Sequence, residues 1–109
     1  MNIKPEIDVL EDDESYIVIA DLPGIDAKNI EIIAYENEIV IKGFRKNQFN
    51  GKFLIIERFS GAFVRKIRFK EYIDTSNAKA ILKDGVLTIQ IPKAKNLLIL
   101  ESCIKIVIK

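Results

Sequence analysis

Residues 78–91 read Ala-Lys-Ala-Ile-Leu-Lys-Asp-Gly-Val-Leu-Thr-Ile-Gln-Ile. Two runs rich in apolar residues lie on either side of Asp84-Gly85 in this stretch. Asp-Gly is favoured in two-residue hairpin turns because both central positions need a positive φ angle. The stretch therefore predicts a β-hairpin with strands at Ala78–Leu82 and Val86–Ile91.

The same pattern extends outward over most of the chain, as short β-branched runs separated by turn residues. Twenty-one of the 109 residues are isoleucine, whose branched Cβ fits a pleated sheet better than a helix. Helical periodicity over ten or more residues is absent, although Asp26–Asn29 has room for one turn. Further strands are predicted at Ile7–Leu10, Tyr16–Leu22, Ile30–Tyr35, Ile39–Gly43, Phe53–Phe59 and Phe63–Phe69, and a last short extended piece is predicted at Ile104–Ile108.

Eight closely spaced strands without crossover helices predict an all-β fold, an antiparallel immunoglobulin-like β-sandwich with an extended C-terminal tail. The length of 109 residues fits one domain. We expect the sandwich to span residues 1–92 and the tail residues 93–109. The strand at Tyr16–Leu22 is apolar on both faces, because Ile17 and Ile19 alternate with other apolar residues. It is therefore expected to lie in the interior of the fold.

The residues needed for most enzyme chemistry are missing from the chain. It contains no histidine and a single cysteine, Cys103, which removes the usual general base and any thiolate metal site. No Gly-rich phosphate loop occurs. The acidic run Glu11–Glu14 lacks the glycine and terminal glutamate of a calcium loop, and the Glu36/Glu38 pair is typical of a surface turn. We therefore expect no enzyme, no cofactor, no metal and no small-molecule substrate.

Charge and hydropathy argue against two further classes of partner. The formal net charge is +1, and no run of basic residues exceeds a pair such as Arg45-Lys46, so a nucleic-acid interface is not expected. The longest apolar run, Leu97–Leu100, is far shorter than the ~20 residues that span a bilayer. With no apolar leader at the N-terminus, the sequence predicts a cytoplasmic protein with no membrane contact.

Six stretches of the chain, in order, resemble the α-crystallin domain of the small heat-shock proteins, and the resemblance runs from about Pro5 to Ile106. The Ala-x-x-x-Asp-Gly-Val-Leu motif at 80–87 is the most specific of them. The resemblance implies an ATP-independent holdase that binds unfolded client proteins and assembles from dimers into larger homo-oligomers. The six stretches are Pro5–Glu11 (PEIDVLE), Ala20–Ile25 (ADLPGI), Ile41–Arg45 (IKGFR), Glu57–Arg65 (ERFSGAFVR), Ala80–Leu87 (AILKDGVL) and Ile104–Ile106 (IKI).

The resemblance also implies how two chains would pair. In bacterial, archaeal and plant members, the strand matching Phe53–Arg58 leaves its own domain and pairs with the partner's first strand, here Ile7–Leu10. The alternative is an ordinary hairpin within one domain. The residues expected at this exchange are Ile7, Val9, Phe53, Leu54, Ile55, Glu57, Arg58 and Arg65.

The tail carries three alternating isoleucines, Ile104, Ile106 and Ile108, which share one face of an extended strand. In the family, an Ile-x-Ile tail docks into a groove at the edge of a neighbouring sandwich. The alternative is a tail strand that packs on its own domain. The resemblance implies that Ile30–Tyr35 and Ala78–Leu82 line this groove. Alternation within these two strands favours Ile32, Ala34, Ala80 and Leu82 as its apolar lining.

The chain departs from the family pattern in three places. The first expected strand begins at Ile7, so the long apolar N-terminal arm of the family is expected to be almost absent. Lys70 follows Phe69 where the family usually has proline, and the apolar run Leu97–Leu100 is unusual for a tether. The alternative function is an adaptor or co-chaperone of the CS-domain type, which typically lacks both the exchanged strand and the tail motif.

Overall fold

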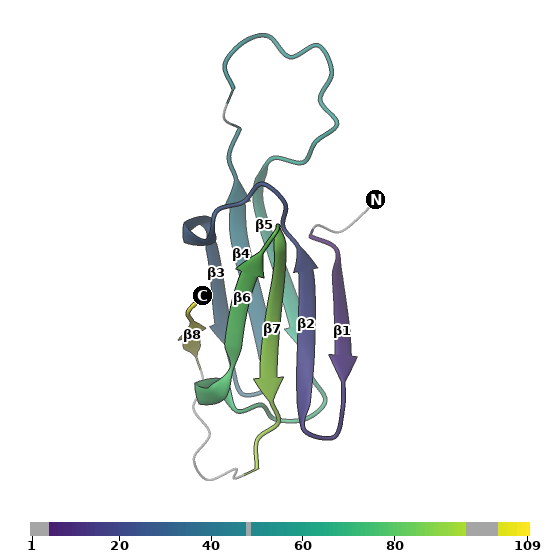
Figure 1. Ribbon diagram of the computed structural model, residues 1–109, viewed down its shortest axis with the longest axis vertical. Helices are drawn as coiled ribbons and strands as arrows, with labels where there is room; N and C mark the ends of the chain where they lie inside the picture. The colour runs from purple at the N-terminus through teal and green to yellow at the C-terminus, as the bar shows by residue number, and fades with distance from the viewer. Residues whose placement is uncertain (1–4, 48, 96–102) are drawn as a thin grey trace.

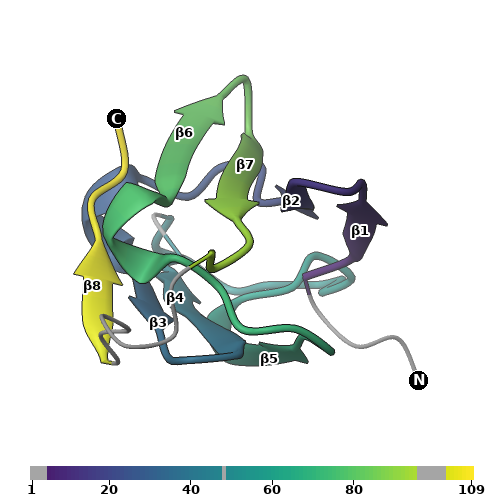
Figure 2. The same ribbon diagram turned by 90° about the horizontal axis from the view of Figure 1, so that it is seen from below.

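The computed structural model describes residues 5–47, 49–95 and 103–109, and it is a sandwich of two four-stranded antiparallel sheets (Figures 1 and 2). Sheet A has the strand order β1-β2-β7-β6, and sheet B has the order β5-β4-β3-β8. The predicted all-β antiparallel sandwich is therefore confirmed. The strands are β1 (Ile7–Glu11), β2 (Ser15–Asp21), β3 (Ile30–Ala34), β4 (Glu38–Arg45), β5 (Gly61–Arg68), β6 (Lys79–Lys83), β7 (Val86–Pro92) and β8 (Ile104–Ile106), with short 3-10 turns at Ala27–Asn29 and Thr75–Asn77.

The hairpin at Asp84-Gly85 forms as its sequence predicts. Asp84 has φ 52° and Gly85 has φ 77°, and Leu82 lies opposite Leu87 where β6 turns into β7. Alternate residues of each strand point between the sheets and form one apolar core. The largest fully buried side chains are Val18, Leu22, Ile32, Ile39, Ile41, Ile73, Leu87, Ile89 and Ile91.

Gly43 lies inside β4 because a neighbouring ring occupies the space of a side chain. It is opposite Phe63 of β5, and a Cβ at residue 43 would lie 2.3 Å from Cζ of that ring. Phe63 is 6% exposed. The glycine therefore lets an aromatic side chain of the edge strand pack flat across the sheet and close one side of the core.

Two sequence-based expectations need correction. Phe53–Phe59 is not a strand in the single chain; it belongs to a loop whose described residues, 46–47 and 49–60, project beyond the end of the sandwich (Figure 1). The branched residues there have β propensity, but a strand needs a partner strand, and within the described residues none pairs with this segment.

Strand β2 does lie in the middle of its sheet, but only its inner face is covered. Ile17 and Ile19 are half-buried on the outer face, because the fold has only two layers.

The projecting loop makes the molecule long, with principal extents of 56 × 25 × 20 Å. None of the helices in the described residues is long and apolar enough to span a membrane. Likewise, within the same ranges, no three His, Cys, Asp or Glu side chains group as metal ligands would. The features left to examine are the edges of the sheets, the loop and the tail.

Candidate interaction sites: the tail groove and the projecting loop

The tail strand β8 lies in a groove between the edges of the two sheets. It pairs antiparallel with β3, where Ile106 is opposite Ile32 and Ile104 is opposite Ala34. The tail end then hydrogen-bonds to β6 of the other sheet. The Lys109 N–H donates to the Ala80 carbonyl at 2.9 Å. One edge of the sandwich is thus closed by a segment bonded to both sheets.

The backbone contacts in this groove are accompanied by apolar burial. Ile106 is 5% exposed and is part of the core, whereas Ile104 and Ile108 are half-buried. Val107 points the other way and is 73% exposed. The groove therefore holds an extended strand through its main chain and its alternate apolar side chains. The identity of the residues between them matters little, because their side chains point away from the groove.

The groove contains all four residues that alternation favours. Ile32, Ala34 and Ala80 are at most 1% exposed, and Leu82 is half-buried beside them. In the single chain the tail occupies the groove of its own chain, whereas the family resemblance implies a neighbour's groove. Which subunit supplies the groove in an assembly stays a prediction. The expected tether Leu97–Leu100 lies outside the described residues.

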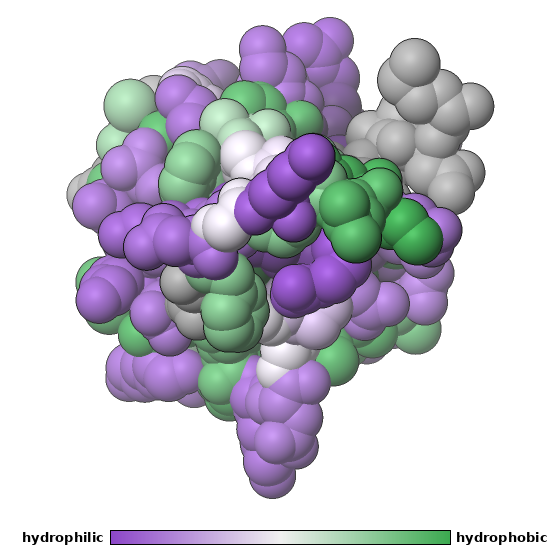
Figure 3. Space-filling view, turned by 90° about the horizontal axis from the view of Figure 1, so that it is seen from above, coloured by the Kyte–Doolittle hydropathy of each residue, from purple (hydrophilic) through white to green (hydrophobic). Residues whose placement is uncertain are grey.

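The projecting loop exposes apolar side chains to an extent that is unusual for a protein surface. Leu54, Ile55 and Ile56 are 85%, 75% and 72% exposed, and Phe49 is 71% exposed. Figure 3 looks onto this end of the molecule and shows apolar side chains grouped on one side of it. Clustered exposed apolar residues mark an interaction surface. Between the loop and the body of the sandwich lies a cleft of about 480 Å³.

Arg45 holds the base of this loop, a role that no sequence pattern predicts. Its guanidinium donates to the carbonyl of Phe59 at 3.4 Å and to the carbonyl of Pro23. These contacts join the end of β4, the start of β5 and the turn after β2. Phe59 in turn lies against Phe63, with ring centroids 6.4 Å apart. The loop is therefore anchored at both ends, while its central apolar residues remain exposed.

Of the residues expected at a strand exchange, Phe53, Leu54, Ile55, Glu57 and Arg58 lie in the projecting loop, and Ile7, Val9 and Arg65 lie on the opposite edge from the tail. Strand β1 is the outermost strand of sheet A, and Ile7 and Val9 face Ala20 and Val18 of β2. Val9 is 46% exposed. Arg65 is half-buried on β5, the outermost strand of sheet B. The loop and β1 form no ladder within the described residues, so the exchange itself stays a prediction.

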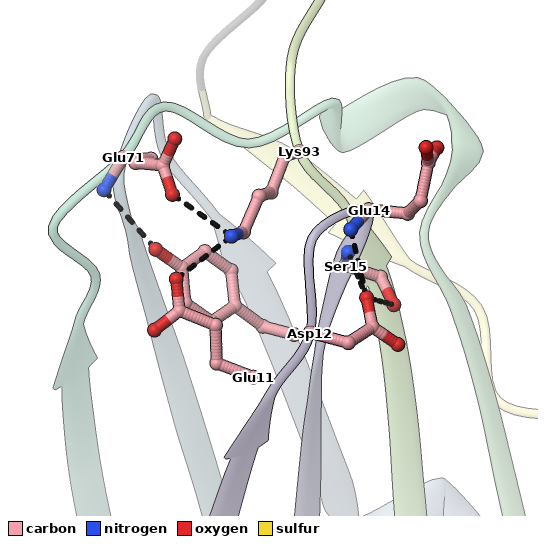
Figure 4. Close-up of polar contacts among 7 residues, drawn as sticks. Glu11, Asp12, Glu14, Ser15, Glu71 and Lys93 are labelled. Atoms are coloured by element: carbon pink, nitrogen blue, oxygen red, sulfur yellow. Dashed lines mark hydrogen bonds and ion pairs between the residues drawn. The ribbon is translucent and has the colours of Figure 1, made fainter.

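Lys93 joins three segments at the far end of the sandwich from the loop (Figure 4). Its ammonium is 2.7 Å from a carboxylate oxygen of Glu11 and 2.9 Å from one of Glu71. It also lies 5.1 Å from the centre of the Tyr16 ring. The hydrogen bond from Lys93 lowers the pKa of Glu11, and the two carboxylates raise the pKa of Lys93. This arrangement ties β1 to the end of β7.

The turn beside this junction is held by a carboxylate. Asp12 accepts hydrogen bonds from the N–H groups of Glu14 and Ser15, both at 2.8 Å. These bonds lower the pKa of Asp12. The acidic run of the sequence therefore shapes the β1–β2 turn. Beyond β7, the N–H of Ala94 donates a hydrogen bond to the carbonyl of Tyr72 at 2.9 Å. The backbone is therefore hydrogen-bonded to the sandwich as far as Ala94.

The fold and these sites define a β-sandwich domain with a groove that holds an extended strand, an open sheet edge at β1 and an exposed apolar loop. The model of the Hsp20/alpha crystallin family matches residues 8–109, and the chain belongs to that family. The resemblance found in the sequence is thus confirmed.

Individual relatives agree with this assignment. The chain is 39% identical to the spore protein SP21 of Stigmatella aurantiaca over 92 residues, covering 82% of this chain and 54% of that protein. It is 40% identical to the 16.9 kDa class I heat shock protein 1 of rice over 93 residues, covering 82% and 62%. The chain thus spans a little over half the length of these curated relatives.

Solved structures have the same fold. Heat shock protein 16.0 from Schizosaccharomyces pombe matches with a TM-score of 0.77 and 27% identity, covering 94% of this chain and 99% of that one. The hspA structure from Xanthomonas axonopodis matches with a TM-score of 0.72 and 35% identity, covering 82% and 92%.

Proposed function

We propose that this protein is an ATP-independent holdase, which binds partly unfolded proteins and prevents their aggregation. Membership of the Hsp20/alpha crystallin family supports the proposal. The observation that carries it is the groove between β3 and β6, which accepts an extended isoleucine-bearing strand through main-chain bonds and apolar contacts. Segments of unfolded proteins offer the same chemistry, namely an open backbone and alternating apolar side chains.

The proposal includes assembly from dimers. The exposed apolar segment Phe53–Arg58 and the outermost strand β1 are complementary. The segment has strand-like composition and pairs with no strand among the described residues, and β1 is an edge without a neighbour. Pairing them between two chains would cover the residues that are most exposed in one chain. Docking of the tail into a groove on another subunit would then join dimers into a larger homo-oligomer. Unfolded clients and further copies of this chain are therefore the proposed partners, and the cytoplasm is the proposed location.

Light scattering of a model client during heating tests the holdase activity directly. With no nucleotide present, the protein at a several-fold molar excess is expected to suppress the rise in scattering. A heat-stable unrelated protein at the same mass concentration is the control for non-specific crowding. Aggregation that proceeds as fast as in the control would contradict the proposal.

Mass measurement separates this proposal from an adaptor of the CS-domain type. Size-exclusion chromatography with light scattering should give a dimer or a larger species at micromolar concentration. A monomer that shows no suppression of aggregation would favour the adaptor instead.

A further inference from the structure

Asn50 and Gly51 form an Asn-Gly pair in the projecting loop, just before the segment Phe53–Arg58. Both residues are exposed, and a Cβ at residue 51 would have nothing within 4 Å. Within residues 5–47, 49–95 and 103–109, neither of the two takes part in a hydrogen bond. The side-chain amide of Asn50 and the main-chain nitrogen of Gly51 are therefore free to approach each other, and water can reach both.

The residue that follows an asparagine decides how readily its side chain reacts. Asparagine is one of the thermolabile residue types. A neighbour with a side chain shields its own main-chain nitrogen, whereas glycine has no Cβ to do so. Of the seven asparagines in the chain, only Asn50 precedes a glycine. The most reactive asparagine of the sequence is thus also one that the fold leaves unprotected.

We propose that Asn50 is a self-modifying site, at which deamidation through a cyclic imide introduces a carboxylate into the loop. The Gly51 nitrogen loses its proton and forms a bond to Cγ of Asn50, and the side-chain amide leaves as ammonia. One water molecule then opens the imide ring at one of its two C–N bonds. Breaking the new bond gives aspartate, and breaking the original main-chain bond gives isoaspartate. Water is the only co-reactant.

Two sites with related chemistry are held by the fold. Asp84-Gly85 can close the same ring, but its backbone is fixed in the hairpin, where the Gly85 carbonyl accepts a hydrogen bond of 2.6 Å from the N–H of Leu22. The side-chain amide of Asn77 donates to a carboxylate oxygen of Asp74 at 2.7 Å. Ring closure at either site requires the fold to open locally. The two sites therefore serve as internal references for Asn50.

Deamidation reduces the positive charge of the loop. The described loop residues, 46–47 and 49–60, include three basic side chains and one acidic side chain. Conversion of the neutral amide to a carboxylate takes the formal net charge of the chain from +1 to zero. Since both aspartate and isoaspartate carry the carboxylate, the change in charge does not depend on which bond of the ring is broken.

The consequence for assembly rests on the proposed exchange of Phe53–Arg58. Residues 5–15, which include β1, carry six carboxylates and no basic residue. Lysines of the same chain neutralise two of them, Glu11 and Glu14. The exchange would bring the positively charged loop to this acidic edge of the partner. We therefore expect deamidation to weaken dimer formation, and to do so less in high salt, because attraction between exposed charges is screened.

Peptide mapping of the full-length chain tests the chemistry, with samples incubated in the native state and in guanidinium chloride. Asn50 should react at a similar rate in both and should give aspartate together with isoaspartate. The rate should rise with pH, because the attacking nitrogen must lose its proton. Asn77 and Asp84 should react only in the unfolded chain. Protection of Asn50 in the native chain as strong as that of Asn77 would overturn the proposal, and aspartate without isoaspartate would exclude the cyclic route.

Gly51→Ala is the matched control for the attacking nitrogen. We expect it to slow the reaction at Asn50 roughly tenfold, which corresponds to ~1.4 kcal/mol of added barrier. An unchanged rate in this variant would also exclude attack by the nitrogen of residue 51.

A second measurement separates the modification from the exchange. Asn50→Asp fixes the charge of the product, whereas Asn50→Gln keeps a neutral amide. In sedimentation velocity at low salt, Asn50→Asp should associate a few-fold more weakly than Asn50→Gln, and the two should converge in high salt. Equal association at low salt would overturn the effect on assembly. A wild-type chain that is monomeric in the same experiment would contradict the exchange, while peptide mapping still decides the modification.

Discussion

Ile106 of the tail lies directly opposite Ile32 of β3, and both side chains are buried in the core between the two sheets. A strand at the end of the chain thus completes a core built by residues far earlier in the sequence. We expect the same contacts with the groove of another subunit in the proposed assembly, because they consist of main-chain hydrogen bonds and apolar packing along one edge. This makes the tail a structural strand that is also suited to link subunits.

The double substitution Ile104→Ala/Ile106→Ala tests the tail as an anchor between subunits. Truncation of buried Ile106 should cost about 2–5 kcal/mol of docking free energy, and half-buried Ile104 should add less. We expect the assembly to fall toward dimers while the β-type circular dichroism is retained. Light scattering coupled to chromatography measures the mass.

Val107→Ala is the matched control for this substitution, because its side chain is 73% exposed between the two anchors. It should leave the mass unchanged. An unchanged mass in the double variant would mean that another surface holds the assembly. Loss of the folded state would mean that the tail serves only the core of its own domain.

The features that could be predicted from sequence are those with a local signal. The Asp84-Gly85 hairpin follows from two adjacent residues, and the anchor face follows from isoleucines spaced two apart. Phe53–Phe59 has the composition of a strand, but within the described residues it pairs with no other strand, and composition alone does not reveal that. The Lys93 junction could not be found, since Glu11 is 82 residues from Lys93 and only the folded sheet brings them together.

Ile55→Pro tests the proposed exchange of Phe53–Arg58 between chains. A proline removes one hydrogen-bond donor and fixes φ, which disrupts pairing with β1 of the partner where the N–H of residue 55 faces that strand. Because Ile55 is 75% exposed in the loop, the fold of the single chain should survive. We expect monomers by sedimentation analysis. Asn50→Pro, in the same loop but outside the exchanged segment, should keep the dimer; a folded dimer of Ile55→Pro would exclude the exchange.

The Lys93 junction predicts an acid-sensitive part of the stability. The pKa of Glu11 is lowered in the folded chain, chiefly by its hydrogen bond from Lys93. Its contribution is therefore present above the unfolded pKa of about 4.3 and is lost as pH falls through the folded value. The pKa of Lys93 is raised, so its contribution is lost only in strong alkali. Lys93→Met should flatten the decline of stability below about pH 4.3, measured by urea unfolding.

Lys95→Met is the control for the loss of stability at low pH, here called the acid limb. The Lys95 ammonium lies 3.4 Å from a carboxylate oxygen of Glu14, and both side chains are largely exposed. Such a pair contributes little, so this variant should follow the wild type at every pH. The Lys93 variant should retain the part of the acid limb that comes from Asp12 and Asp74, whose pKa values are lowered by other hydrogen bonds. A wild-type profile in Lys93→Met would show that the junction adds no pH-dependent stability.

Gly24→Ala and Gly85→Ala should differ in cost although both glycines have nearly the same backbone angle, with φ of 76° and 77°. At Gly24 nothing lies within 4 Å of an added Cβ, so the loss is the left-handed backbone penalty of about 1–2 kcal/mol. At Gly85 the Cβ would lie 2.9 Å from Cα of Pro23. The hairpin tip would then have to move away from Pro23. This movement is opposed by the hydrogen bond of 2.6 Å that the Gly85 carbonyl accepts from the N–H of Leu22. We expect Gly85→Ala to cost at least ~1 kcal/mol more, by analogy with overpacked sites.

Urea midpoints at one fixed protein concentration measure the difference between the two variants, since assembly makes stability depend on concentration. Equal losses would mean that the turn after β2 moves freely away from the hairpin, and that the contact between Pro23 and Gly85 does not hold β6 and β7 against the rest of the sandwich.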